Sequence, residues 1–317
     1  KGWFVYMKFD VVVTNPPFQD TTDRGKTQHK LWIDFTRLSF DSLLKEDGVL
    51  CQVSPSSFQS PSSKILQLFK DKKVTELHLD TEKYFPEVGS SFANYNIWNT
   101  LNDGSRTKIY TENGEFEIKL DDDVFYLPND FCEESYSIHQ KVIFNTKNKL
   151  KIEWDYVTCH NILLWSIIKS KDGKKSREKN LNSSLSKTKK GNHIHPLLHT
   201  NKQIWYSTER QSFADNKKVM WSRSGYTKPF YDAGKLGTTD MGYYIKVDTE
   251  DEGKNLAHNL NLKLFQYIFK TAKWSGFGNE KVFVALPMIP LDKKLTDEEM
   301  YDFFGLKNEE RDYVRTN

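Results

Sequence analysis

The first 110 residues alternate between short apolar runs and longer segments in which apolar residues recur at helical spacing. Apolar runs at residues 9–14, 49–53 and 74–79 predict three strands. Apolar residues then recur every three or four positions over residues 31–44, and again after Pro61, which predicts one helix in each interval. This alternation of strands and helices is typical of an α/β domain with a largely parallel sheet.

Two further strands are predicted at residues 91–100 and 108–110. Between them lies Asn102-Asp103-Gly104, and an Asp-Gly pair favours the tight turn of an antiparallel hairpin. We therefore expect these two strands to pair with each other and to close the sheet.

The chemistry of the chain changes where the first predicted strand ends, at Asn15-Pro16-Pro17-Phe18. The two prolines cannot donate backbone hydrogen bonds, so the strand must stop there. The amide of Asn15, the carbonyl of Pro16 and the ring of Phe18 then lie at the carboxyl end of a strand, where open α/β sheets bind ligands. Two acceptors and a flat ring suit a planar heterocycle with an exocyclic amine, such as adenine.

These four residues resemble the Asn-Pro-Pro-Phe/Tyr signature of amino-methyltransferases that use S-adenosylmethionine. The resemblance implies that Asn15, Pro16, Pro17 and Phe18 form the catalytic motif. Asn15 and Pro16 would accept hydrogen bonds from the target NH2, and Phe18 would stack on the flipped-out base. The signature does not choose among DNA adenine, RNA adenine and protein glutamine, and an ordinary strand that ends in a Pro-Pro turn is the alternative.

A second aromatic candidate is Phe85, in a Tyr-Phe-Pro sequence that follows the third predicted strand. This sequence resembles the Phe-Pro segment that many DNA adenine methyltransferases place opposite the Asn-Pro-Pro motif. The resemblance implies that Phe85 contacts the flipped base from its other side. The alternative is a core Phe that precedes a turn. In this topology the loops at residues 19–30 and 54–58 would border the same pocket.

The main motif for S-adenosylmethionine is the feature of this family that we do not find. In such enzymes a glycine-rich turn follows the first strand of a seven-stranded sheet, and only fourteen residues precede Asn15. Gly276 and Gly278 follow a helical pattern, so a loop explains them at least as well. We expect a catalytic domain that has the target-base half only and is inactive alone. A missing N-terminal segment or a partner chain would complete it.

The pattern changes beyond about residue 120, where acidic and Pro-Asn-Asp sequences suggest a boundary. We expect a partial methyltransferase domain over residues 1–120, a linker over 121–150 and a DNA target-recognition domain over 151–317. The later order of aromatic runs resembles the target-recognition region of type II restriction–modification adenine methyltransferases. The expected fold is therefore α/β, the C-terminal half of a Rossmann-like methyltransferase sheet, followed by an α+β target-recognition domain.

Positive charge is concentrated in residues 171–190, which carry eight Lys or Arg and two acidic residues. With few apolar residues this segment is either a solvated surface loop or an arm that contacts phosphates. Three more basic residues are interleaved with aromatic runs over residues 200–250. The candidate DNA contacts are Lys171, Lys174, Lys175, Arg177, Lys187, Lys189, Lys190, Arg210, Arg223 and Lys228.

Other observations limit the cofactors and the location. His193, His195 and His199 have metal-like spacing, but no Cys or carboxylate lies near them in the sequence, so no metal is expected. The three cysteines are far apart, and no apolar run is long enough to span a membrane. We expect a cytoplasmic protein, encoded by a bacterium or a phage.

Residues and resemblance together predict a site-specific DNA adenine N6-methyltransferase of a type II restriction–modification system. It would transfer a methyl group from S-adenosylmethionine to an adenine that is flipped out of double-stranded DNA. One alternative is a non-catalytic DNA-recognition subunit that needs a partner for cofactor binding. The other is a methyltransferase that acts on RNA adenine or protein glutamine.

Overall fold

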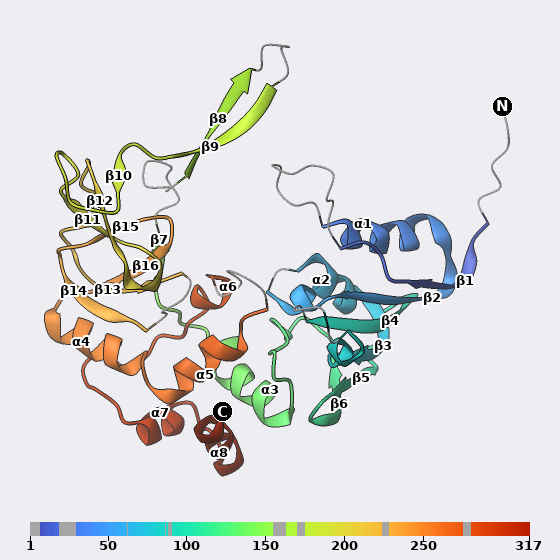
Figure 1. Ribbon diagram of the computed structural model, residues 1–317. Helices are drawn as coiled ribbons and strands as arrows, with labels where there is room; N and C mark the ends of the chain where they lie inside the picture. Colours follow the sequence, from blue (N-terminus) through green and yellow to red (C-terminus); the bar gives the residue numbers. More distant parts are fainter. Residues whose placement is uncertain are drawn as a thin grey trace. The chain divides into compact units, whose positions relative to one another are not determined.

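The computed structural model divides into two compact units (Figure 1). Unit 1 is Lys1–Ser137 with Ala272–Ser275, and unit 2 is Ile138–Thr271 with Gly276–Asn317. The division at residue 137 falls inside the segment that was predicted as a linker. The structure describes residues 7–18, 30–61, 63–85, 87, 91–154, 163–169, 175–223, 228–274 and 280–317.

Unit 1 is built on one mixed six-stranded sheet, in the order β1-β2-β4-β3-β5-β6. β1 is parallel to β2, and β3 is parallel to β5, whereas β4 is antiparallel to both of its neighbours. The predicted α/β class is confirmed. The elements are β1 (Phe9–Thr14), α1 (Leu31–Leu38), β2 (Leu44–Pro55), α2 (Lys64–Asp71), β3 (Lys72–His78), β4 (Phe92–Leu101), β5 (Arg106–Thr111) and β6 (Gly114–Lys119).

The predicted hairpin between the fourth and fifth strands is wrong. β3 lies between β4 and β5, and Leu77 pairs with Tyr95 on one side and with Ile109 on the other. All three side chains are fully buried, so this arrangement places β3 inside the sheet rather than at its edge. A turn does form after β4, but it leads into a strand that pairs with β3, and the hairpin of this region joins β5 to β6.

The helix α2 covers the sheet through an apolar face that its sequence specifies. Ser63 caps the helix, since its side-chain oxygen accepts hydrogen bonds from the backbone N–H groups of Ile65 and Leu66. Phe69 lies one turn further along this face, and the centre of its ring is 4.9 Å from the ring centre of Tyr95 in β4. This packing joins the helix to the middle of the sheet.

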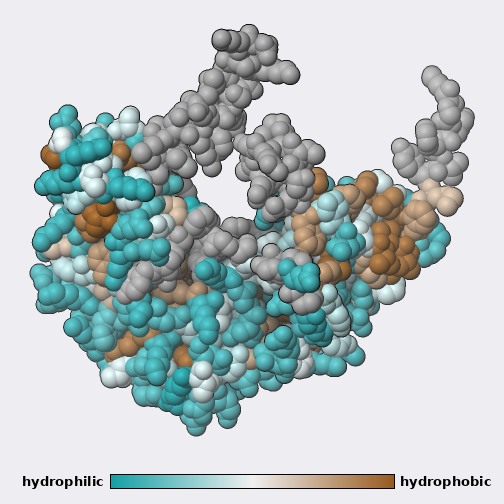
Figure 2. All heavy atoms as spheres, viewed as in Figure 1, coloured by the Kyte–Doolittle hydropathy of each residue, from teal (hydrophilic) through white to brown (hydrophobic). Residues whose placement is uncertain are grey.

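β1 is parallel to its neighbour, as predicted, but it is not buried, because it forms one edge of the sheet. The exposed fractions of Val11 and Val13 are 53% and 78%, and Phe9 is also exposed. Figure 2 shows brown, apolar residues gathered on this side of unit 1. An exposed edge strand of this composition presents both unpaired backbone groups and apolar side chains.

Unit 2 has the α+β composition that was predicted, with two small sheets, a two-stranded hairpin and helices. The sheets are β14-β13-β16-β7 and β10-β12-β11-β15, and β8 pairs with β9. Together with α3 (Glu133–His139), which crosses from unit 1, its elements are β7 (Glu153–Trp154), β8 (Leu163–Lys169), β9 (Lys175–Leu181), β10 (Leu185–Ser186), β11 (His195–Leu198), β12 (Ile204–Ser207), β13 (Lys217–Ser222), β14 (Phe230–Ala233), β15 (Gly237–Thr238), β16 (Gly242–Lys246), α4 (Glu250–Asn259), α5 (Lys263–Thr271), α6 (Glu280–Phe283), α7 (Asp297–Phe303) and α8 (Asn308–Thr316).

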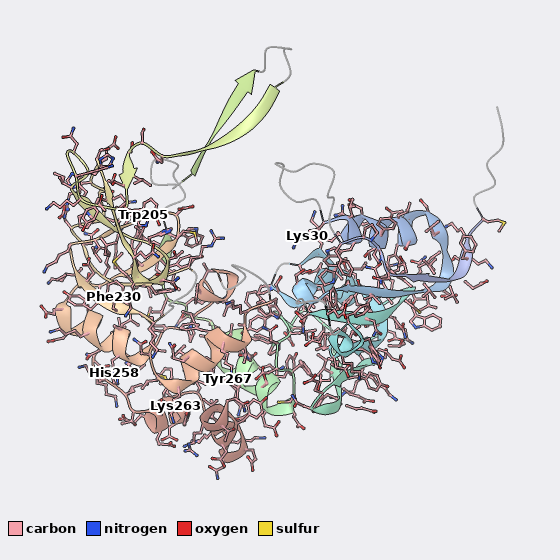
Figure 3. All side chains as sticks on the ribbon, in the orientation of Figure 1. Lys30, Trp205, Phe230, His258, Lys263 and Tyr267 are labelled. Atoms are coloured by element: carbon pink, nitrogen blue, oxygen red, sulfur yellow. The ribbon has the colours of Figure 1, made fainter. Side chains whose placement is uncertain are left out.

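Two apolar clusters lie in this part of unit 2, and Figure 3 labels one residue of each, Trp205 and Phe230. Trp205 packs with Leu185 and Leu197 within one sheet. Phe230 packs on a cluster that joins Leu198 of that sheet to Met220 and Tyr244 of the other. Within the described residues, no helix is long and apolar enough to cross a membrane.

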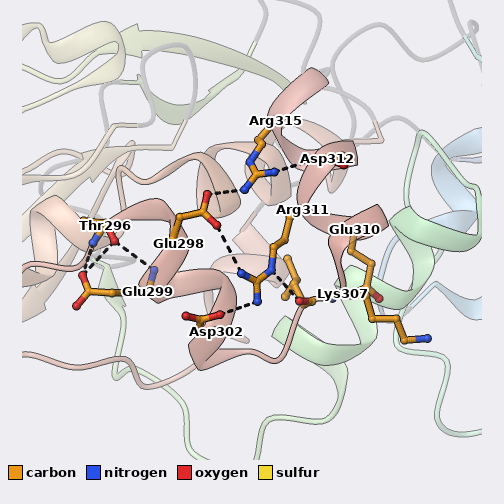
Figure 4. Close-up of polar contacts among 10 residues, drawn as sticks. Thr296, Glu298, Glu299, Asp302, Lys307, Glu310, Arg311, Asp312 and Arg315 are labelled. Carbon is orange, nitrogen blue, oxygen red and sulfur yellow. Dashed lines mark hydrogen bonds and ion pairs between the residues drawn. The ribbon is translucent and has the colours of Figure 1, made fainter.

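The last two helices are joined by charged side chains (Figure 4). Thr296 and Glu299 form a capping box at the start of α7. Arg311 of α8 donates to Asp302 at 2.6 Å, and Arg315 donates to Glu298 at 2.6 Å. Ion pairs on the surface therefore hold α8 against α7 in addition to the buried contacts of the helices.

Candidate active site

The Asn-Pro-Pro-Phe sequence follows directly on the last residue of β1. Asn15 is exposed, Pro16 is buried and Phe18 is half-buried. No hydrogen bond joins the Asn15 side chain to another residue that the structure describes. The local sequence explains this arrangement, since the prolines end the ladder with β2 and leave the Asn15 amide open to a ligand at the carboxyl end of the strand.

Three phenylalanines meet beside this sequence, and we call Phe18, Phe85 and Phe92 the aromatic cluster. The ring centroids of Phe18 and Phe92 are 5.2 Å apart, with 33° between the ring planes. Those of Phe85 and Phe92 are 5.3 Å apart, with 53° between the planes. The rings of the two predicted stacking residues, Phe18 and Phe85, therefore both contact the buried ring of Phe92. Phe92 was predicted only as part of a strand, and its position became apparent only with the strand order.

The end of β2 is tied to the start of β4, where Phe92 is the first residue. Pro55 is the partner of Phe92 in the antiparallel register, and the backbone N–H of Ser56 donates to the carbonyl of Ser91 at 3.0 Å. Phe58, which was expected near the pocket, is fully buried in the core against Phe69 and Tyr95. Only the first part of this predicted loop therefore lies beside the aromatic cluster.

The loop that carries Phe85 is held to β4 by polar contacts. Asn94 donates to the hydroxyl of Thr81 at 2.9 Å. Partial burial raises the pKa of Glu82, and a hydrogen bond from the backbone N–H of Phe92 to the Glu82 carboxylate opposes that shift. Lys83 binds Asp80 at 2.5 Å, and this hydrogen bond raises the pKa of Lys83. These contacts restrict the position of Phe85 relative to Phe92.

A buried hydrogen-bond network lies behind the strands. Gln52 of β2 donates to the hydroxyl of Thr36 at 2.8 Å and to that of Tyr95 at 3.0 Å. The Thr36 hydroxyl donates in turn to the carbonyl of Trp32. Burial raises the pKa of Tyr95 to about 12, so the phenol stays neutral at physiological pH. The network joins α1, β2 and β4 without placing a charge under the site.

The chemistry available here is binding and orientation. Asn15, Pro16 and the three phenylalanines contain no group that ionises near neutral pH. They contain two oxygen acceptors and two half-buried aromatic rings, Phe18 and Phe85, that contact the buried ring of Phe92. Such a set can orient an amine and a planar ring, but it cannot by itself transfer a proton at neutral pH.

The predicted DNA contacts have different surroundings. Lys171 and Lys174 lie outside the described residues, and the backbones of Lys175 and Arg177 belong to β9. Lys187, Lys189 and Lys190 are exposed, and the Lys187 ammonium lies 5.6 Å from the ring centre of Trp205. Arg223 is half-buried and Lys228 is exposed. Arg210 forms an ion pair with Asp215 inside unit 2.

Two of the three histidines with metal-like spacing, His193 and His199, bind other residues. His193 binds the carbonyl of Ser183 at 2.9 Å, and His199 binds the hydroxyl of Thr239 at 3.0 Å. In the part of the chain that the structure describes, no group of three His, Cys, Asp or Glu residues could hold a metal ion.

Comparison with known proteins identifies the region that contains the site. Residues 2–88 match the family model of the Eco57I restriction-modification methylase. A solved structure of the Type IIL restriction-modification enzyme MmeI in complex with DNA is also similar, with 10% sequence identity and a TM-score of 0.40. That match covers 97% of this chain and 57% of the MmeI chain. A search of the curated proteins gave no match. Residues 2–88 are therefore similar to the methylases of restriction–modification systems.

Proposed function

We propose that this chain is the target-base and DNA-recognition part of a site-specific DNA adenine N6-methyltransferase. The observation that carries the proposal is the exposed side chain of Asn15 at the carboxyl end of β1, close in sequence to Phe18 of the aromatic cluster. The match to a restriction–modification methylase family over residues 2–88 includes Asn15, Phe18 and Phe85.

The mechanism depends on the poor nucleophilicity of an adenine amine, whose lone pair is delocalised into the ring. The Asn15 side-chain oxygen and the Pro16 carbonyl would each accept one N–H of the NH2 group. This would localise the lone pair on the nitrogen and orient it. S-adenosylmethionine would supply an electrophilic methyl group on its sulfonium. Because none of Asn15, Pro16 and the three phenylalanines carries a nucleophile, we expect catalysis by positioning and electrostatics, without a covalent enzyme intermediate.

The aromatic cluster would hold the base once it has left the helix. Extrusion of a base costs a few kcal/mol, and stacking on aromatic side chains offsets that cost. Phe18 is half-buried and Phe85 is half-buried, so each ring keeps part of its surface for a planar ligand. A purine satisfies both the ring faces and the two acceptors, which favours adenine over a glutamine side chain.

Unit 2 would bind the DNA backbone. Lys187, Lys189 and Lys190 are exposed next to β10, and Lys228 is exposed before β14. If these side chains neutralise phosphates, the binding constant should fall steeply as salt is raised, because bound counterions are released.

The first experiment is calorimetric titration of S-adenosylmethionine into the chain, with and without duplex DNA. The second is transfer of a tritiated methyl group to DNA, RNA and protein, followed by digestion and separation of N6-methyladenine. Label in DNA N6-methyladenine supports the proposal. Label in RNA adenine or in glutamine, with none in DNA, would show that the methyl acceptor is not DNA and would overturn the proposal.

A second candidate function has support from the exposed edge of β1. Val11 and Val13 lie on an edge strand whose other side carries no partner strand among the described residues. A DNA-recognition subunit that obtains its cofactor site from a missing segment or a partner chain would have such an edge. Salt-sensitive DNA binding without any S-adenosylmethionine binding would favour this candidate.

A further inference from the structure

Phe92 occupies the position where the ends of three strands meet. It contacts Phe18, which follows β1, and Phe85, which follows β3. It is also the register partner of Pro55, the last residue of β2. Within the described part of the chain, no ring contact joins Phe18 to Phe85 directly, so the two rings are connected through Phe92.

The position of Phe92 is itself fixed by its surroundings. Its exposed fraction is 4%, and it opens a strand that lies between β2 and β3. The hydrogen bond from Ser56 to Ser91 fixes the backbone on one side. On the other side, the side chain of Asn94 in β4 donates to the hydroxyl of Thr81 at 2.9 Å, which ties the strand to the segment that leads to Phe85. A ring that is this buried offers little surface for a substrate, but it can hold two other rings that do.

We propose that Phe92 is a positioning residue that sets the separation and tilt of Phe18 and Phe85, and thereby the slot for the flipped base. The inference rests on the proposed function and deepens it. Phe18 and Phe85 follow different strands, and a shift of either ring would change the width of the slot. Productive binding of a planar base requires the reacting amine to be placed within a fraction of an ångström, so small ring movements should affect the rate strongly.

The test is Phe92→Leu, with Phe69→Leu as the matched control. Phe69 is equally buried in unit 1 and has two ring contacts of its own, but it contacts neither Phe18 nor Phe85. In steady-state methyl transfer to adenine in duplex DNA, Phe92→Leu should lower kcat by about tenfold or more and leave KM for DNA within about twofold. Phe69→Leu should leave both constants within about twofold, although it destabilises the fold.

A second measurement does not depend on methyl transfer. In protein labelled with ¹³C on phenylalanine, Phe92→Leu should shift the ring resonances of both Phe18 and Phe85, whereas Phe69→Leu should leave them in place. A single-stranded oligonucleotide that contains 2-aminopurine should lose fluorescence on binding the wild type and lose less of it with Phe92→Leu.

The outcomes separate the inference from the proposed function. If no acceptor is methylated but the ring shifts and the 2-aminopurine difference are found, the proposed function fails and the positioning role stands. If both variants lower kcat equally, or if the Phe18 and Phe85 resonances do not move in Phe92→Leu, Phe92 is only a core residue and the inference is overturned.

Discussion

The aromatic cluster of unit 1 and the Lys218–Asp232 pair of unit 2 use buried side chains in opposite ways. Lys218 is 0% exposed, and its ammonium donates to Asp232 at 2.7 Å and to two backbone carbonyls. The Asp232 carboxylate also accepts from the backbone N–H groups of Lys235 and Leu236. By contrast, the Asn15 amide is exposed and makes no hydrogen bond to another described residue.

The difference lies in how far each polar group is already satisfied. An ammonium has three donors, and Lys218 uses all three inside the protein. Burial lowers the pKa of Lys218, and the hydrogen bond to Asp232 opposes that shift. The positive charge of the ammonium is therefore balanced by the carboxylate inside the protein. Such a group stabilises the fold and has no capacity left for a ligand. The acceptors beside the aromatic cluster keep that capacity. Substitution of Asn15 should therefore lower activity and leave stability unchanged, whereas substitution of Lys218 should lower stability and leave activity unchanged.

Asn15→Ala should have the largest effect and should act on activity alone. Removing one of two acceptors for the target amine should lower methyl transfer by about a thousandfold, which corresponds to about 4 kcal/mol in the barrier. The fold should be unchanged, because the Asn15 side chain is exposed. The measurement is tritiated methyl transfer to DNA, run on this chain and on any longer form of the protein, together with DNA affinity by fluorescence anisotropy.

Asn148→Ala is the control for that change, since Asn148 is also an exposed Asn but belongs to unit 2. It should leave transfer and DNA affinity within about twofold, as expected for a surface change of under about 0.5 kcal/mol. If Asn15→Ala weakens DNA binding as much as it slows transfer, Asn15 has a structural role and the comparison of the two regions fails.

Lys218→Met should lower the stability of the protein and leave its activity unchanged. It leaves the Asp232 carboxylate buried without its charged partner, and such a change typically costs about 3–5 kcal/mol. The free energy of unfolding should fall by that amount in urea denaturation, while the methyl-transfer rate per folded molecule stays the same. In the double variant Lys218→Met/Asp232→Leu, much of the stability should return. A loss below about 1 kcal/mol for the single change would show that water reaches the pair and satisfies it.

His139 extends the comparison to pH. Burial lowers its pKa to about 3, and its Nε2 binds the Thr271 hydroxyl, which itself donates to the carbonyl of Tyr267. The ring is therefore neutral in the folded state, whereas the unfolded state gains a proton below about pH 6.5. Stability from this group is complete above pH 6.5 and is lost as pH falls, by about 2 kcal/mol between pH 7 and pH 5.

The check is urea denaturation of the wild type and of His139→Gln at pH 7 and pH 5. The difference between the two proteins should shrink or reverse at pH 5, since the variant lacks the titrating ring. An equal pH dependence in both proteins would mean that His139 is already protonated in the fold. The ring contacts of the aromatic cluster should not respond to this change of pH, because none of its members ionises.

Local patterns in the sequence predicted the elements and the site residues that depend on them. The Pro-Pro sequence after β1 determined where the strand ends and hence where Asn15 and Phe18 lie. The same kind of argument placed Phe85 after β3. Phe18 and Phe85 both contact Phe92, because β1 and β3 end on the same side of the sheet.

Non-local pairing explains what the sequence did not reveal. The Asn-Asp-Gly turn after β4 is locally suited to a hairpin, but β3 supplies apolar partners on both sides and separates β4 from β5. The position of Phe92 depends on that strand order. Lys218 has the local character of a surface residue, and only the approach of Asp232 from β14 makes its burial possible.

The ion pairs between α7 and α8 should give the smallest effect. Arg315 donates to Glu298 and to Asp312, both at 2.6 Å, but 39% of its side chain is exposed (Figure 4). Water and salt screen such pairs, so Arg315→Gln should lower the free energy of unfolding only slightly, and less again in 1 M salt. Urea denaturation at low and high salt measures this. The ion pairs are as short as that of Asp232, at 2.6 Å against 2.7 Å, so burial and the additional backbone donors to Asp232 are what distinguish the two substitutions. If Arg315→Gln lowers the free energy of unfolding as much as Lys218→Met does, hydrogen bonding is enough to make a charged residue of this protein important for stability, and burial is not required.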